Sequence, residues 1–341
     1  MAEYKKEGRL KALIVTGCLA QRYRQEILDE IPEVETKRLV TTGGHFAYLK
    51  IAEGCDKHCT YCIIPKIRGN FRSVPMEQLL SEAEYLAEQG VKELILVAQE
   101  TTLYGKDLYG EKSLHKLLRE LCKISGIRWI RILYCYPEEI YDELIQTIKE
   151  EPKICHYLDL PIQHANDEIL KRMGRRTTKQ ELIDIISKLR REIPDIALRT
   201  TLITGFPGET KEQHEELMEF VDEMEFDRLG VFTYSPEEDT AAARMEGQIE
   251  EEVKEERQAE LMELQQEIAF DTAENMVGKE VLVMIEGKVA DENAYVGRTY
   301  RDAPNVDGLI FVNTEEELMS GDFAKVKVSG AVDYDLIGGL I

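Results

Sequence analysis

Short apolar runs alternate with longer amphipathic stretches through the middle of this 341-residue chain, and this alternation constrains its fold more than any other feature. The apolar runs are predicted to be strands, at residues 48–52, 94–98, 129–134, 157–160, 198–203 and 229–234. The stretches between them have the 3.6-residue period of a helix, at residues 76–88, 113–123, 138–150, 179–191 and 211–223. Six βα units predict an α/β fold in which a parallel sheet curls into a partial (βα)6 barrel.

The last part of the chain has a different pattern. Residues 250–275 are charged and predict one long helix, which leads out of the barrel region. From Gly278 onward, short alternating runs at 281–285, 308–312 and 323–328 are separated by turns containing Gly, Asn and Asp. This pattern predicts a small antiparallel β-barrel at the C-terminus.

Three cysteines follow the first predicted strand with the spacing C-x3-C-x2-C: Cys55, Cys59 and Cys62. In barrels of this kind the chemistry lies on loops after the strands. A cubane iron–sulfur cluster has four irons, so three thiolates hold three of them and leave the fourth open to a small molecule. Zinc would take a fourth Cys or His, and ligation by His58 would strain the loop that contains it. The spacing therefore favours a 4Fe-4S cluster, with a zinc site or a chance grouping as the alternatives.

Composition narrows the function classes. The chain is 43% hydrophobic, which is enough for a sizeable core, and it has neither an apolar run of about 20 residues nor an apolar N-terminal signal. Its seven cysteines fit a reducing compartment, so we expect a cytoplasmic protein. The 43 Lys and Arg against 66 Asp and Glu give a net charge of −23, which disfavours nucleic acid and favours basic partners.

The cysteine loop, with Tyr61 before Cys62, resembles the signature of the radical S-adenosylmethionine (SAM) enzymes. The resemblance implies that SAM chelates the open iron and that an electron from the cluster cleaves it to a 5′-deoxyadenosyl radical. Residues 64–69, 158–164 and 204–209 resemble motifs of the methylthiotransferase branch, and the C-terminal barrel is similar to its TRAM domain. Residues 98–105, 134–137 and 297–308 most resemble the methylthiotransferases that modify the β-carbon of an aspartate in small-subunit ribosomal protein S-twelve.

Several residues after predicted strands are candidates for binding the cofactor that the resemblance implies. Gly205 and Pro207 form either a backbone approach to SAM or a plain strand-ending turn. Gln99 and Glu100 follow a strand, where a carboxylate meets the cofactor's amino group or caps the next element. Arg199 either forms an ion pair with a carboxylate of the cofactor or forms a solvated ion pair at the protein surface. With Tyr61, the predicted cofactor-binding residues are Tyr61, Gln99, Glu100, Arg199, Gly205 and Pro207, and no catalytic side chain is assigned.

The N-terminus departs from the methylthiotransferase pattern. Residues 11–21 match the segment around the third cysteine of a domain that, in the family, holds a second cluster with three cysteines. The first two of those cysteines are not in this sequence, and about forty residues cannot build a doubly wound domain of about 100. Cys18 is therefore either a remnant ligand of the auxiliary cluster or a buried thiol. The predicted domains are a remnant at 1–40, a radical SAM domain at 41–275 and a TRAM domain at 276–341.

Three functions remain open for this sequence. The first is methylthiotransfer to a ribosomal-protein aspartate, and the second is methylthiotransfer to a modified adenosine of tRNA. The third is a fragment limited to SAM cleavage or to binding a ribosomal protein. From Gly278 onward six Lys or Arg stand against twelve Asp or Glu, which suits a basic protein partner better than RNA. We therefore expect a basic ribosomal protein as substrate and neither nucleic acid nor membrane as partner.

Overall fold

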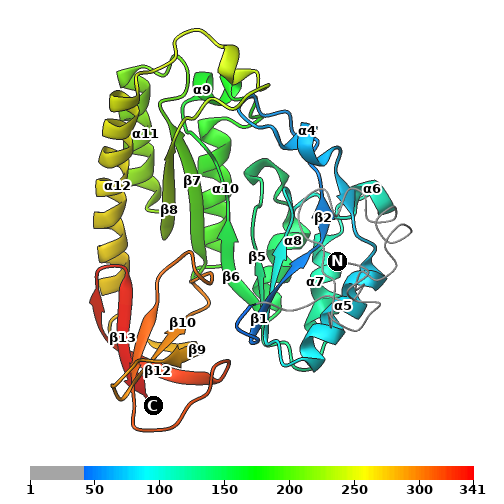
Figure 1. The fold of residues 1–341 in the computed structure, drawn as a ribbon, viewed down its shortest axis with the longest axis vertical. Helices are drawn as coiled ribbons and strands as arrows, with labels where there is room; N and C mark the ends of the chain where they lie inside the picture. The colour runs from blue at the N-terminus through cyan, green and yellow to red at the C-terminus, as the bar shows by residue number, and fades with distance from the viewer. Residues whose placement is uncertain (1–41) are drawn as a thin grey trace, which may run out of the picture.

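The computed structural model describes residues 42–341, so the predictions for residues 1–40, including Cys18, lie outside it. A six-stranded sheet forms the centre of the molecule, in the order β1-β4-β5-β6-β7-β8 (Figure 1). Every neighbouring pair in this sheet is parallel, and β1 and β8 are its two edges. The predicted partial barrel is therefore confirmed. Its strands are β1 (Phe46–Lys50), β4 (Glu93–Val97), β5 (Trp129–Ile132), β6 (Ile154–Asp159), β7 (Ala197–Thr204) and β8 (Arg228–Thr233).

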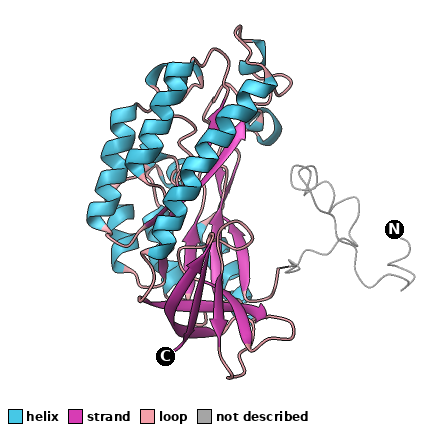
Figure 2. Cartoon of the chain, turned by 90° about the vertical axis from the view of Figure 1, so that its left-hand side faces the viewer, coloured by secondary structure: helices cyan, strands magenta, loops and turns pink. Residues whose placement is uncertain are grey.

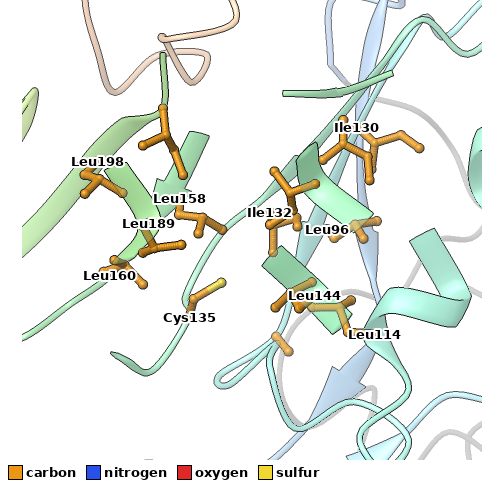
Figure 3. Packing of buried hydrophobic residues seen from close by; sticks show 14 of the residues in the cluster. Leu96, Leu114, Ile130, Ile132, Cys135, Leu144, Leu158, Leu160, Leu189 and Leu198 are labelled. Atoms are coloured by element: carbon orange, nitrogen blue, oxygen red, sulfur yellow. The ribbon is translucent and has the colours of Figure 1, made fainter. Parts of the chain in front are cut away.

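Amphipathic helices cover the outer face of the sheet because each has a stripe of apolar residues at helical spacing. In α7, for example, Leu114, Leu117 and Leu121 are fully buried. Figure 3 shows Leu114 and Leu144 of the helices beside Leu96 and Ile132 of the strands. These amphipathic helices are α5 (Met76–Glu88), α7 (Leu114–Cys122), α8 (Asp142–Glu150), α10 (Lys179–Glu192) and α11 (Lys211–Met224). The longer α12 (Glu251–Glu274) also covers the sheet, but the face that it buries contains Lys254, Arg257 and Gln265 beside Leu261 and Ile268.

The predicted helix at 138–150 begins later than expected. Pro137 starts a separate 3₁₀ turn, η1 (Pro137–Glu139), and α8 follows it because Ile140 has an extended backbone conformation. The remaining short elements are β2 (Ala52–Glu53), α4 (Ile64–Arg68), β3 (Arg72–Ser73), α6 (Lys106–Tyr109), α9 (Asp167–Arg172) and η2 (Ala242–Arg244). Within residues 42–341, no helix combines the length and apolar character that a membrane crossing requires.

The C-terminal region is a closed five-stranded barrel, as predicted, in the order β10-β11-β13-β12-β9. Its strands are β9 (Glu280–Lys288), β10 (Ala294–Arg298), β11 (Ile310–Asn313), β12 (Phe323–Val332) and β13 (Asp335–Leu340). One pair, β11 with β13, is parallel, whereas the prediction was wholly antiparallel. The sequence did not predict β10 and β13 because both contain glycine, which is depleted in strands. Here the glycines allow close packing, since a Cβ on Gly338 would lie 2.5 Å from Val326 Cγ1.

The C-terminal barrel packs against the amino-terminal ends of the sheet strands. In Figure 2 the helices cover the strands of the sheet, and the barrel lies below them. Trp129, the first residue of β5, meets Phe323 of the barrel with ring centroids 4.9 Å apart. Glu93, the first residue of β4, binds Arg131 Nε at 2.8 Å and Arg298 Nη2 of the barrel at 2.7 Å, and all three side chains are buried. The two domains therefore share a buried network of ion pairs.

Candidate active site

The cysteine loop, residues 54–62, follows β2 at the carboxyl-terminal end of the sheet, opposite to the C-terminal barrel. Gly54 begins it with φ of 82°, and a Cβ there would lie 2.2 Å from the Asn70 carbonyl oxygen. Only glycine fits that conformation and that space. The Gly54 amide donates to Gln99 Oε1 at 2.8 Å, so the side chain after β4 fixes the start of the loop.

The three cysteines of this loop point into the protein while the histidine between them does not. Cys55 and Cys59 are buried and Cys62 is half-buried, whereas His58 is exposed. Burial raises the pKa of Cys55 to about 11, and the thiols of Cys59 and Cys62 shift it in the same direction. No three His, Cys, Asp or Glu side chains between residues 42 and 341 are arranged to hold a single metal ion. Three thiols without a histidine are the donor set of an iron–sulfur cluster, and the loop fits that group.

Two tyrosines and an arginine surround Cys59. The Tyr136 hydroxyl lies 3.5 Å from Cys59 Sγ, and burial together with the Cys59 thiol raises the pKa of Tyr61 well above its usual value. The Arg175 guanidinium lies 4.2 Å from the centre of the Tyr136 ring. Tyr61 was predicted for this site, whereas Arg175 was not. Arg175 belongs to the loop between α9 and α10, and no local pattern of the sequence connects that loop with the cysteines.

Glu100 is fully buried behind the cysteine loop. Its Oε1 accepts hydrogen bonds from the Thr102 amide, at 2.8 Å, and from the Thr102 hydroxyl. Its Oε2 has no hydrogen-bond partner in the part of the chain that the structure describes. Burial raises the pKa of Glu100 to about 7, against the hydrogen bonds from Thr102 and the charge of Lys57, which lower it. This carboxyl group can therefore change its charge near neutral pH and has a free oxygen for a donor.

Arg199 lies deeper in the sheet than the other predicted cofactor-binding residues. It is the third residue of β7, and its Nη1 binds Asp159 Oδ1 at 2.8 Å. Its Nε lies 3.5 Å from Asp307 Oδ1 of the C-terminal barrel. The structure thus gives Arg199 two carboxylate partners within the protein.

Gly205 and Pro207 form a buried turn after β7, at the same end of the sheet as the cysteine loop. Gly205 has φ of 69°, and a Cβ there would lie 2.3 Å from Cγ of Lys254 on α12. Phe206 packs its ring 5.3 Å from that of Tyr234, and the Glu209 side chain accepts from the Phe206 amide at 3.0 Å. The turn is therefore rigid, and α12 supports it from outside.

The segment after β6 contributes a neutral histidine. His164 is fully buried, and burial lowers its pKa to about 3, with the charges of His214 and Arg257 acting in the same direction. Its Nδ1 accepts from the Asn166 amide at 3.0 Å, so this ring helps to shape the loop. The backbone of Gln163 is bonded to β7, which extends the pairing of this segment beyond β6.

Comparisons with known proteins agree with this geometry. The Radical SAM superfamily model matches residues 49–221, and the TRAM domain model matches residues 277–341. The ribosomal protein uS12 methylthiotransferase RimO of Lachnoclostridium phytofermentans is 62% identical over 99% of this chain and 85% of its own length. The chain belongs to the RimO family of radical SAM enzymes. The RimO of Clostridium botulinum is 49% identical over 99% of this chain and 84% of its own.

Among solved structures, the radical SAM methyltransferase TsrM from Kitasatospora setae superposes with a TM-score of 0.47. Its sequence is 18% identical over 56% of this chain and 38% of that protein. The RimO relatives confirm the resemblance to methylthiotransferases, and membership of the radical SAM superfamily implies a 4Fe-4S cluster and SAM as cofactors. The alignment with the first relative extends over 375 residues, so it includes positions without a counterpart in this chain.

Proposed function

We propose that this chain is a methylthiotransferase that acts on an aspartate of ribosomal protein uS12, the substrate in the names of its RimO relatives. The observation that carries the proposal is the cysteine loop. It turns three thiols inward at the carboxyl-terminal end of a parallel six-stranded sheet, in a chain that is 62% identical to a RimO. When bound, a 4Fe-4S cluster and SAM supply the electron and the radical chemistry of the family.

Each residue near the loop then has a definite task. Cys55, Cys59 and Cys62 hold one cluster, and Gln99 fixes the loop through the Gly54 amide. Glu100 receives the amino group of SAM on its free Oε2, because a buried carboxylate gains most from a cationic partner. Further cofactor contacts are assigned to the side chain or backbone of Tyr61, Gly205 and Pro207.

We assign to Arg199 a structural role. It helps to close the interior of the sheet on the side of the C-terminal barrel, and this closed side is called the floor. Its two carboxylate partners, Asp159 and Asp307, join β6 to the C-terminal barrel. The Tyr157 hydroxyl donates to Asp307 Oδ2 at 2.8 Å and continues this floor. A floor of this kind excludes water from the reacting end of the cofactor.

The charge of the chain supports a protein substrate. The net charge is −23, and the segment from Gly278 onward has twice as many acidic as basic residues. Such a surface attracts a basic ribosomal protein and repels the phosphates of RNA. We assign residues 41–275 to the radical SAM domain and 276–341 to the TRAM domain, and Cys18 to the segment outside the described residues.

Anaerobic reconstitution with iron and sulfide, followed by incubation with SAM, uS12, sulfide as the sulfur source and dithionite as the one-electron reductant, tests the proposal. We expect about four irons per chain from the loop cysteines, SAM cleavage to 5′-deoxyadenosine, and a mass increase on uS12 that maps to one aspartate. Cys59→Ala loses the iron, while Cys122→Ala, which alters a thiol on α7, keeps it. Iron retained in the Cys59→Ala variant, or a methylthio group found on tRNA and not on uS12, would overturn the assignment.

A further inference from the structure

Arg175 is a buried cation with unused hydrogen-bond donors. Only 1% of its side chain is exposed, and its Nη2 donates to the Pro161 carbonyl oxygen at 3.0 Å. Its Nε and Nη1 are buried and have no hydrogen-bond partner between residues 42 and 341. A guanidinium has five N–H donors, and leaving them unpaired away from water is costly. The position therefore suits a further acceptor that is not a side chain of the described region.

The segment that contains Arg175 is bonded directly to the cysteine loop. The Thr60 amide donates to the Met173 carbonyl oxygen at 2.8 Å. Gly174 has φ of 75°, and a Cβ there would lie 3.0 Å from the His58 carbonyl oxygen. The backbone before Arg175 thus lies against the backbone around the cysteines, with no space for a side chain between them.

The nearest carboxylates to this guanidinium are engaged mainly with lysines. Glu139 binds Lys57 at 2.5 Å and Lys112 at 2.8 Å, and Glu138 lies 3.5 Å from Lys57. The distance from Glu138 Oε2 to Arg175 Nη2 is 3.7 Å. Lys57 and Lys112 therefore hold Glu139 closely, and Glu138 is the one of these two carboxylates that lies near Arg175. The Arg175 guanidinium lies beside Tyr136, whose hydroxyl contacts Cys59.

We propose that Arg175 is the electrostatic partner of the cluster held by the three cysteines and that it raises the reduction potential of that cluster. The inference rests on the proposed function in requiring that the loop binds the cluster. Reduction transfers one electron from a low-potential one-electron donor to the cluster and breaks no bond. The added negative charge is stabilised by a buried cation, and N–H donors directed at cluster sulfurs act in the same direction.

The test measures the midpoint potential of the reconstituted cluster without SAM, by a dithionite titration followed by electron paramagnetic resonance. In Arg175→Gln we expect the equilibrium constant for reduction to fall at least tenfold, which is about 59 mV toward more negative potential for one electron. Arg175→Lys keeps the charge and falls between this variant and the wild type. The matched control is Arg176→Gln, which removes the same charge from the next, exposed residue and leaves the potential unchanged.

Every outcome decides between defined alternatives. A wild-type potential in Arg175→Gln with full iron content overturns the inference, and weakened SAM binding in that variant would assign Arg175 to the cofactor carboxylate. An equal shift in Arg176→Gln overturns it as well, since net charge alone would then act. If Arg175→Gln loses iron, Arg175→Met carries the same prediction. If both neutral variants lose iron while Arg175→Lys keeps it, the positive charge at this position is required and the inference is supported. If all three variants lose iron, the inference is overturned. A wild type without iron refutes the proposed function itself.

Discussion

Removing Arg298 is expected to loosen the C-terminal barrel from the sheet. The side chain is buried and makes three hydrogen bonds, to Glu93, to Glu286 and to the Asp302 carbonyl oxygen. Although burial alone raises the pKa of Glu93, Arg131 and Arg298 outweigh it and hold the pKa below its usual value, so Glu93 is charged at neutral pH. Arg298→Met leaves that charge with one partner instead of two.

The expected cost follows from these contacts. Breaking a buried ion pair from one side destabilises a protein by about 3–5 kcal/mol, and we take about 3 kcal/mol because Glu93 keeps Arg131. This corresponds to roughly a 150-fold increase in the unfolding constant, at about 1.4 kcal/mol per factor of ten. Because the folded pKa of Glu93 is lowered, its contribution is present above the unfolded pKa and is lost as the pH falls through the folded pKa. The gap between variant and wild type should therefore narrow below about pH 4.

Trp129 provides the assay, since it is the sole tryptophan of the chain and its ring contacts Phe323 across the interface. In a urea titration we expect its emission to shift to longer wavelength at a lower concentration in Arg298→Met than in the wild type. Lys327→Met, which removes a charge from an exposed position of β12, serves as the control. A variant within 1 kcal/mol of the wild type, with unchanged Trp129 emission, would refute the reasoning.

Three further predictions concern the cysteine end of the sheet. SAM binding to the reconstituted wild type should weaken as the pH falls below about 7, because the raised pKa of Glu100 makes its carboxyl neutral there, and equilibrium dialysis of Glu100→Gln should show little of that dependence. Gly54→Ala should lose most of its iron in a colorimetric assay while its circular dichroism persists, since its Cβ would overlap the Asn70 carbonyl oxygen. Gly205→Ala should lower the free energy of unfolding by about 1–2 kcal/mol from its positive φ alone, plus the overlap with Lys254, and Lys254→Ala should restore only the second part. A Gly205→Ala variant fully restored by Lys254→Ala would contradict this division.

Local patterns were sufficient for the sheet and for the cysteine loop. Each strand of the sheet is a short apolar run that is followed, further along the chain, by a helix. The spacing of apolar residues that distinguishes a strand from a helix involves only residues close together in the sequence, so it can be recognised without the structure. The same holds for Cys55, Cys59 and Cys62, whose spacing alone brings three thiols into one loop. The position of that loop follows from its place after the first strand, because the carboxyl ends of parallel strands share one edge.

Contacts between distant segments could not be predicted in this way. Arg175 meets Tyr136 only because the loop after α9 folds over the cysteine loop. Arg199 was recognised by residue type, but one of its partners, Asp307, belongs to another domain. In β13, Gly338 weakens the strand pattern but is required by the packing of Val326, which only the closed barrel shows.

The cysteine loop and the C-terminal barrel lie at opposite ends of the sheet. This placement separates the charges that set the electron affinity of the loop from the charges that attract a basic partner. A strand of six to eight residues, such as β6 or β7, spans about 20–26 Å at about 3.3 Å per residue. This is more than two screening lengths of about 8 Å at physiological salt. Substitutions of solvent-exposed charges that retune the barrel toward a different basic partner therefore leave the electron affinity of the metal loop unaffected, whereas the buried Asp307, which reaches Arg199, is not screened in this way. The two properties can evolve independently within one polypeptide.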